Sequence, residues 1–243
     1  MNPSVVEQLL AVNQRFYSAL AQPFARSRAA PQPGFARLAA FWPQPCRRVL
    51  DVGCGEGRFG RFLAAHGLNG EYVGVDFSAE LLAIARQGLP HGVFHQRDLL
   101  DPACLADLGQ FDAVACLATL QHIPGADNRQ RLMRSLAERL TPTGRLLVSH
   151  WQFLASERQR RKVRPWAEIG LTAEAVESHD YLLAWDRGER GLRYVAWIGP
   201  EELARLAQAA GCRLLAEFYS DGREGNLNLY GVMGRLAASG SEE

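Results

Sequence analysis

Apolar residues recur along this chain at two spacings, which together predict the elements of an α/β protein. Helical spacing predicts a first helix over 4–20, and the proline-rich stretch after it leaves room only for a short helix near 35–41. From residue 47 short buried strands alternate with helices. Strands are expected at 49–52, 72–75, 93–95, 111–117 and 145–149, and helices at 58–66, 79–86 and 127–140. This alternation implies right-handed crossovers and a parallel sheet with helices on both faces.

The alternation stops after Trp151 and resumes near residue 200. A helix is then expected over 200–210, followed by strands at 213–219 and 227–233, which have no helix between them and must pair as an antiparallel hairpin. The fold class predicted is a single α/β domain over 1–243 with a Rossmann-like, seven-stranded sheet. Its parts are an N-terminal helical cap (1–46), a core (47–150), an insertion after the fifth strand (151–198), and a closing helix and hairpin (199–235).

Composition is typical of a soluble globular protein. Apolar residues make up 47% of the 243 residues and charged residues 22%, which argues against disorder. No apolar run is long enough to span a membrane and no signal-peptide layout is present, so a cytoplasmic protein is expected. The net charge of +1 gives no global attraction for nucleic acid. The five cysteines lack a C-x-x-C spacing, and no metal site is expected.

A glycine-rich turn follows the first strand of the core. It reads Asp51-Val-Gly53-Cys54-Gly55-Glu-Gly57, and Asp76 ends the next strand. Glycines at such a turn let backbone N–H groups approach a ligand, and the following helix offers its positive end to an anion. The spacing of Gly55, Gly57 and Gly60 also matches the dinucleotide fingerprint, so the turn alone leaves two kinds of cofactor open.

Three features favour an adenosyl-amino acid over a dinucleotide. Asp51 lies just before the glycines, where a carboxylate would repel a pyrophosphate but can orient the loop or an ammonium group. After the third strand, Asp98 can accept from an adenine amino group while the Leu99 N–H meets a ring nitrogen. The terminal antiparallel hairpin is foreign to the all-parallel sheet that binds nicotinamide cofactors.

With these motifs, residues 47–150 and the closing hairpin resemble the class I S-adenosylmethionine-dependent methyltransferases. The resemblance implies that S-adenosylmethionine is the cofactor, that Asp76 holds its ribose, and that the glycine turn faces its methionine half. The cofactor-binding residues implied are Asp51, Gly53, Cys54, Gly55, Gly57, Asp76, Phe77, Asp98, Leu99 and Leu117. The insertion is expected to cover the methyl acceptor.

The flanking segments resemble a narrower family, the tRNA methyltransferases that esterify the carboxymethyl group of wobble uridine. The resemblance rests on short motifs at 24–33, 180–185, 193–194 and 219–226. This sequence departs from the family at positions expected to bind the acceptor, among them Gln32, Gln121 and Ala196. The departures put the substrate in doubt, so a tRNA partner and a small-molecule acceptor both stay open.

Three residues are candidates for the chemistry itself. His122 follows the fourth strand, where the family places its acceptor, and can serve as a base for an acceptor that loses a proton. A carboxylate acceptor needs no base but a cation to hold it, a role that suits Arg28 or Arg193. The basic run 158–164, with Trp166 and Trp185, is a candidate RNA surface or simply a solvated face. A non-catalytic module that binds the cofactor is a third possibility.

Overall fold

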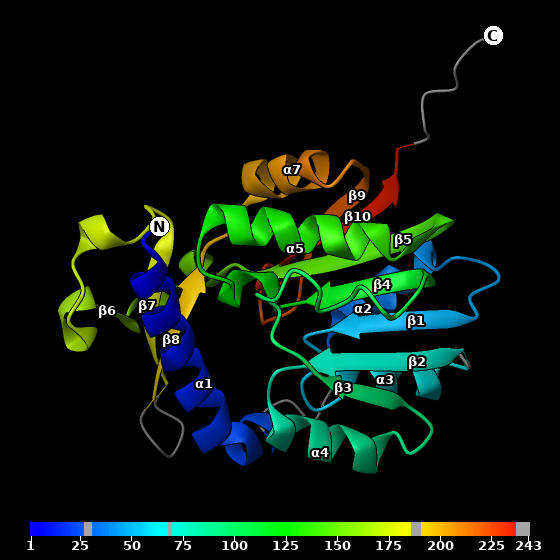
Figure 1. Cartoon of the computed structure of the whole chain (residues 1–243), viewed down its shortest axis with the longest axis horizontal. Helices are drawn as coiled ribbons and strands as arrows, with labels where there is room; N and C mark the ends of the chain where they lie inside the picture. Colours follow the sequence, from blue (N-terminus) through cyan, green and yellow to red (C-terminus); the bar gives the residue numbers. More distant parts are fainter. Residues whose placement is uncertain (27–30, 68–69, 186–190, 237–243) are drawn as a thin grey trace, which may run out of the picture.

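The computed structural model describes residues 1–26, 31–67, 70–185 and 191–236, and in it one large sheet lies between layers of helices (Figure 1). The strands of this sheet come from both halves of the chain. In chain order they are β1 (Arg48–Val52), β2 (Glu71–Asp76), β3 (Val93–Gln96), β4 (Phe111–Leu117), β5 (Leu140–Trp151), β9 (Cys212–Ser220) and β10 (Asn228–Arg235).

The seven strands are arranged in the order β3-β2-β1-β4-β5-β10-β9, which confirms the predicted Rossmann-like sheet. β1 to β5 pair in parallel, whereas β10 runs antiparallel to both β5 and β9, as expected for the closing hairpin. Because the chain steps outward from β1 through β2 to β3 and then returns to β4 on the other side of β1, the strand order reverses between β1 and β4. In open α/β sheets, ligands bind outside the carboxyl ends of the strands at such a reversal.

Helices cover both faces of the sheet (Figure 1). Successive strand residues point to opposite faces, so Leu146 and Val148 pack against α5 and α7 while Leu147 faces α2 and α3. Each of these fully buried side chains stabilises the fold by about 1.5–3 kcal/mol. The helices are α2 (Pro33–Leu38), α3 (Arg58–Ala65), α4 (Ala79–Gly88), α5 (Ala126–Glu138) and α7 (Pro200–Ala209).

Two predicted boundaries are wrong in detail. α5 begins at Ala126, with Gly125 at its N-cap, and ends at Glu138, whereas the expected helix covers 127–140. β5 covers Leu140–Trp151, so it begins five residues before the strand expected at 145–149. A bulge between Phe111 and Ala113 in the pairing of β4 with β5 accommodates the longer strand.

The N-terminal helix α1 (Pro3–Arg26) is longer than predicted and packs away from the main sheet. Directly before the helix, the Asn2 side chain accepts a hydrogen bond from the Ser4 N–H at 3.0 Å, so Asn2 caps its first turn. The helix has a kink at Leu20, whose backbone is non-helical. α1 contacts α4 and the insertion, and it thereby closes one side of the sheet's carboxyl edge. No helix among the described residues is both long and apolar enough to cross a membrane.

The insertion forms a second, three-stranded sheet beside α1 (Figure 1). Its strands are antiparallel, and β8 lies against α1. Asn13 of α1 accepts a hydrogen bond from the Tyr194 N–H at 2.9 Å and so joins the helix to this sheet. The elements of the insertion are α6 (Glu157–Arg160), β6 (Val163–Arg164), β7 (Asp180–Trp185) and β8 (Gly191–Ala196), with 3₁₀ turns at Phe153–Ala155, Trp166–Ile169 and Ala173–Ala175.

The turn between β9 and β10 is tied to the N-terminal region through Asp221. Its carboxylate accepts hydrogen bonds from the Gly34 N–H at 2.7 Å, the Tyr230 hydroxyl at 2.6 Å and the Asn228 side chain at 2.7 Å. Gly34 has no room for a Cβ atom because the Tyr230 ring lies against it. These contacts fix α2 on the closing hairpin.

Candidate functional site

An open cavity lies at the carboxyl ends of the parallel strands, where α1 approaches the sheet. Its walls come from the turns after β1, β2 and β3, from the segment after β4, and from α1. The cavity opens to solvent at its mouth. All cofactor residues implied by the sequence line this cavity except Gly57. Those that do are Asp51, Gly53, Cys54, Gly55, Asp76, Phe77, Asp98, Leu99 and Leu117.

Three glycines shape the turn after β1. The φ angles of Gly53, Gly55 and Gly57 are 75°, 54° and 76°, a region that residues with a Cβ atom rarely adopt. At Gly53 a Cβ atom would also overlap the side chain of Thr119. Gly57 does not line the cavity but occupies the N-cap of α3, where it directs the chain into the helix. The tight turn therefore brings backbone, rather than side chains, to the cavity wall.

Asp76 at the end of β2 is anchored to this turn. Its Oδ2 atom accepts a hydrogen bond from the Gly55 N–H at 2.8 Å and its Oδ1 atom from the Ser78 N–H at 2.9 Å. Burial raises the pKa of the carboxyl to about 6, although the two N–H donors favour its charged form. A carboxylate offers about four lone-pair sites, so Asp76 keeps capacity to accept further hydrogen bonds from the hydroxyls of a ligand.

Two more buried carboxyl groups line the cavity. Asp51 accepts a hydrogen bond from the Tyr72 hydroxyl at 2.6 Å, and burial raises its pKa to about 7. Glu56 is also buried, and its Oε1 atom has no hydrogen-bond partner among the described residues. An unpaired acid in such a place is costly unless a cation or a donor reaches it. Sequence reasoning missed Glu56, although its position between Gly55 and Gly57 was a usable signal.

The part of the cavity formed by residues that follow β2 and β3 is largely apolar. Phe77, Leu81 and Leu99 contribute hydrophobic surface there. Asp98 is exposed, and its Oδ1 atom accepts a hydrogen bond from the Leu100 N–H at 2.9 Å. Apolar walls with a polar group at the rim suit a flat heterocycle that carries an amino group.

The segment after β4 forms the wall that faces the glycine turn. Ala118 has a φ of 52°, a left-handed conformation that is unusual for a residue with a side chain. Its N–H donates to the Ser149 carbonyl oxygen at 2.9 Å and lies 3.0 Å from the Ser149 hydroxyl oxygen. The Thr119 hydroxyl lies within hydrogen-bond distance of the Leu117 and Gly53 carbonyl oxygens, at 3.1 and 3.3 Å. Backbone strain of this kind concentrates at functional sites.

His122 lies at the end of this wall, on the 3₁₀ turn Leu120–His122. Its Nδ1 atom is 3.0 Å from the Tyr194 carbonyl oxygen, and its Nε2 atom is 3.0 Å from the Tyr17 hydroxyl oxygen. A carbonyl oxygen only accepts, so Nδ1 carries a hydrogen, and in the neutral ring Nε2 then accepts from Tyr17. Tyr17 lines the cavity together with Asn13. The neighbouring Gln121 is buried and accepts from the Trp151 N–H, which gives it a structural role.

Of the two arginines proposed for the acceptor, only Arg193 belongs to the described residues, and it does not line the cavity. Arg28 lies outside the described residues. Arg193 is buried on β8, and its guanidinium carbon lies 4.8 Å from the ring centroid of Phe16, 5.1 Å from that of Trp151 and 5.4 Å from that of Trp185. Among the described residues that line the cavity, Arg58 is the only lysine or arginine.

The basic run of the insertion lines a second cleft. Arg161, Lys162 and Arg164 form part of its wall, and Arg15 of α1 contributes another cation. Trp185 also lines this cleft, but it is only 8% exposed. Its ring is therefore packed into the core and not offered as a stacking surface, contrary to the expectation for RNA bases.

The side chains that line the first cavity fit S-adenosylmethionine. Apolar side chains suit its adenine ring, and Asp76 suits its ribose hydroxyls. The buried Asp51 and Glu56 suit the positive charge of its amino group, and the Oε1 atom of Glu56, which has no hydrogen-bond partner among the described residues, can accept from that group. Within the part of the chain that the structure describes, no group of three or more His, Cys, Asp or Glu side chains is arranged to hold a metal ion.

Comparison with known proteins agrees with this geometry. The family model described as a methyltransferase domain matches residues 14–217. A ubiquinone biosynthesis O-methyltransferase from Bordetella avium is 34% identical over 168 residues, which cover 68% of this chain and 61% of the relative. Another, from Burkholderia thailandensis, is 28% identical over 178 residues, covering 70% of this chain and 66% of the relative. The match thus spans less than two thirds of the length of either relative.

Solved structures share the fold at low sequence identity. A S-adenosylmethionine-dependent methyltransferase from Clostridium acetobutylicum superposes with a TM-score of 0.66 at 11% identity, covering 91% of this chain and 99% of that chain. An amino pentose methyltransferase from Micromonospora echinaspora, solved with S-adenosylmethionine bound, gives a TM-score of 0.63 at 20% identity, covering 89% of this chain and 97% of that chain. These likenesses extend the agreement in fold over most of the chain.

Proposed function

This chain belongs to the class I S-adenosylmethionine-dependent methyltransferases, as the sequence predicted, and we propose that it methylates a hydroxyl oxygen of a small organic acceptor. We choose this acceptor because Tyr17 and His122 form a hydrogen-bonded pair on the cavity wall. A hydroxyl group must lose its proton as it is methylated, so it benefits from a base at this position. A carboxylate needs a cation instead.

The cofactor supplies a methyl group on a sulfonium, so the acceptor gains that methyl group and gives up a proton. The protein's own residues position the acceptor and receive its proton. In our proposal the neutral His122 ring takes a proton at Nε2, directly or through the Tyr17 hydroxyl, while Nδ1–H stays bound to the Tyr194 carbonyl oxygen. Positioning and exclusion of water supply the rest of the acceleration.

The surroundings of this pair support a small and partly apolar acceptor. Leu10, Gln14 and Ile123 line the cavity beside Tyr17 and His122. They offer apolar surface and an amide, with no lysine or arginine among them. The curated relatives support the same class, because they are named as O-methyltransferases of ubiquinone biosynthesis, a small-molecule pathway.

A carboxymethyl group on tRNA is the second candidate acceptor. The observation that favours it is the cluster of Arg15, Arg161, Lys162 and Arg164 around the second cleft, where RNA phosphates can bind. Two contacts weaken the attraction, since Arg161 pairs with Glu157 and Arg164 with Glu168.

One labelling experiment separates these candidates. The protein is incubated with S-adenosylmethionine labelled in its methyl group and, in separate reactions, with phenols and catechols, with carboxylic acids, and with bulk tRNA. We expect label on a hydroxyl compound and none on tRNA. Label on tRNA or on a carboxylic acid alone would overturn the proposal. Cofactor binding without transfer to any acceptor would favour the non-catalytic module.

A further inference from the structure

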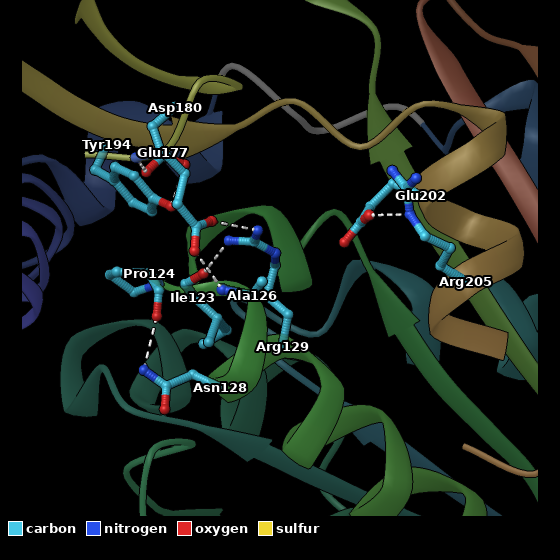
Figure 2. A network of polar contacts seen from close by, with 10 residues as sticks. All are labelled: Ile123, Pro124, Ala126, Asn128, Arg129, Glu177, Asp180, Tyr194, Glu202 and Arg205. Atoms are coloured by element: carbon cyan, nitrogen blue, oxygen red, sulfur yellow. Dashed lines mark hydrogen bonds and ion pairs between the residues drawn. The ribbon is translucent and has the colours of Figure 1, made fainter. Parts of the chain in front are cut away.

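We propose that a buried polar network centred on Glu177 and Arg129 positions His122 for catalysis by fixing the carbonyl group that selects its tautomer. This inference rests on the proposed role of His122. The network joins the insertion to the first turn of α5, and Figure 2 shows its members converging from the two elements. Asp180 and Tyr194 fall within two of the short motifs named in the sequence, at 180–185 and 193–194, but no member of the network was assigned a role there.

The first link is an ion pair between a buried arginine and a glutamate whose side chain is 29% exposed. An Arg129 guanidinium nitrogen donates to Glu177 at 2.7 Å, and the Arg129 side chain is only 6% exposed. The other Glu177 oxygen accepts from the Ala126 N–H at 2.7 Å, at the N-terminus of α5. Arg129 also donates to the Ile123 carbonyl oxygen at 3.2 Å, one residue after His122 (Figure 2). Glu177 is therefore held to the segment that carries His122.

The second link runs from Glu177 to Tyr194. The Glu177 N–H donates to an Asp180 oxygen at 3.0 Å, and the Tyr194 hydroxyl donates to the other Asp180 oxygen at 2.7 Å (Figure 2). Burial, together with the neighbouring Asp180 charge, raises the pKa of Tyr194 well above its ordinary value, so the hydroxyl keeps the proton that it donates. Asp180 thus holds the side chain of Tyr194 in place within the insertion.

The third link reaches the histidine. The Tyr194 carbonyl oxygen accepts from His122 Nδ1 at 3.0 Å and from the Asn13 side chain at 3.2 Å, while the Tyr194 N–H donates to Asn13. Tyr194 is thus held by its hydroxyl on one side and by its backbone on the other. A partner at one ring nitrogen decides which nitrogen carries the hydrogen. A displaced carbonyl would let the hydrogen move to Nε2, the atom that faces Tyr17.

If the network only stabilised the fold, weakening the network would leave the protonation of the two His122 ring nitrogens unchanged. The test therefore observes which ring nitrogen of His122 carries the hydrogen, by ¹⁵N-edited NMR of the histidine side chains at a pH where the ring is neutral. The signals of His122 are assigned by their loss in His122→Gln. The variants are Glu177→Gln, Asp180→Asn and Tyr194→Phe, each close in shape to the original residue. Glu202→Gln is the matched control, because Glu202 pairs with Arg205 on the exposed surface of α7 (Figure 2).

In the native protein and in Glu202→Gln we expect His122 to be protonated at Nδ1 alone. In the three network variants we expect a second population protonated at Nε2. Turnover of the acceptor found by the labelling experiment should fall about tenfold, with KM changed less than kcat. Unchanged His122 signals in every network variant that folds would overturn the inference, and Tyr194→Phe decides it if the carboxyl variants do not fold. The spectra need neither cofactor nor acceptor, so a failure of the proposed function leaves this result readable.

Discussion

The hydroxyl oxygen of Tyr17 lies 3.0 Å from Nε2 of His122, although 105 residues separate them in the sequence. Tyr17 belongs to the N-terminal helix and His122 to the 3₁₀ turn that follows β4. Both residues line the cavity. Their contact defines where an acceptor meets the cofactor in our account.

Replacement of Tyr17 by phenylalanine tests the role of this contact. We expect kcat to fall about 100-fold, the scale of a lost proton-transfer contribution, while cofactor affinity stays within about twofold. The free energy of unfolding should fall by only about 1 kcal/mol, because one hydrogen bond is lost. Steady-state kinetics and calorimetry measure these effects.

Tyr219→Phe is the control, since Tyr219 is 43% exposed on β9. It should behave as the native protein does. If Tyr17→Phe kept native kcat, the hydroxyl would have no part in the reaction.

Gly53→Ala tests the shape of the turn after β1. Gly170→Ala is its matched control, because Gly170 has a similar φ of 73° but a Cβ atom there would meet no described atom within 4 Å. Both variants should lose about 1 kcal/mol of stability through the left-handed backbone. Gly53→Ala should lose about 1–3 kcal/mol more, because the new methyl group overlaps Thr119.

Urea unfolding measures the stability difference, and a titration measures cofactor affinity. Only Gly53→Ala should lose affinity. Adding Thr119→Ala to Gly53→Ala should restore part of the stability. Equal effects of the two glycine substitutions would show that the close approach of Thr119 is unimportant.

Burial of Asp51 predicts how the stability of the cofactor-free protein depends on pH. The folded protein keeps the Asp51 proton up to about pH 7, whereas the unfolded chain loses it near about pH 3.9. Between these values the folded state binds more protons, so the free energy of unfolding falls as pH rises and levels off above about pH 7. Asp51→Asn removes this titration.

The free energy of unfolding of Asp51→Asn, relative to that of the native protein, should therefore be about 2.6 kcal/mol higher at pH 8 than at pH 5. Urea unfolding at both pH values gives the difference, and comparing the two values cancels any constant effect of the substitution. Asp127→Asn, at an exposed position, should show no such change. The same stability difference at both pH values for Asp51→Asn would contradict a raised pKa.

The sequence predicted the cofactor half of the cavity better than the acceptor half. Asp51, the glycine turn and Asp76 lie within one strand–helix–strand unit, so local pattern sufficed to place them together. Tyr17 lies within the helix predicted over 4–20, but nothing local indicated that this helix would meet His122. That contact depends on how the insertion and α1 pack, which residue spacing does not reveal.

The residues proposed to bind the acceptor were hard to predict for the same reason, because their surroundings depend on how distant segments pack. Arg193 was considered as a ligand for a carboxylate, yet the packing of Phe16, Trp151 and Trp185 around it became visible only in three dimensions. The ion pair between Arg129 and Glu177 likewise joins residues 48 apart. Both depend on the path of the insertion, whose irregular elements gave no clear periodicity in the sequence.

The central claim is that the turn after β1 and the carboxylate of Asp76 together hold S-adenosylmethionine. Calorimetric titration with S-adenosylhomocysteine, the demethylated product, tests it most directly in the native protein, in Asp76→Asn and in the exposed control Asp127→Asn. We predict one site in the native protein and the control, and affinity at least tenfold weaker in Asp76→Asn, corresponding to about 1.4 kcal/mol or more. Native-like affinity in Asp76→Asn, or no binding to the native protein, would contradict the account.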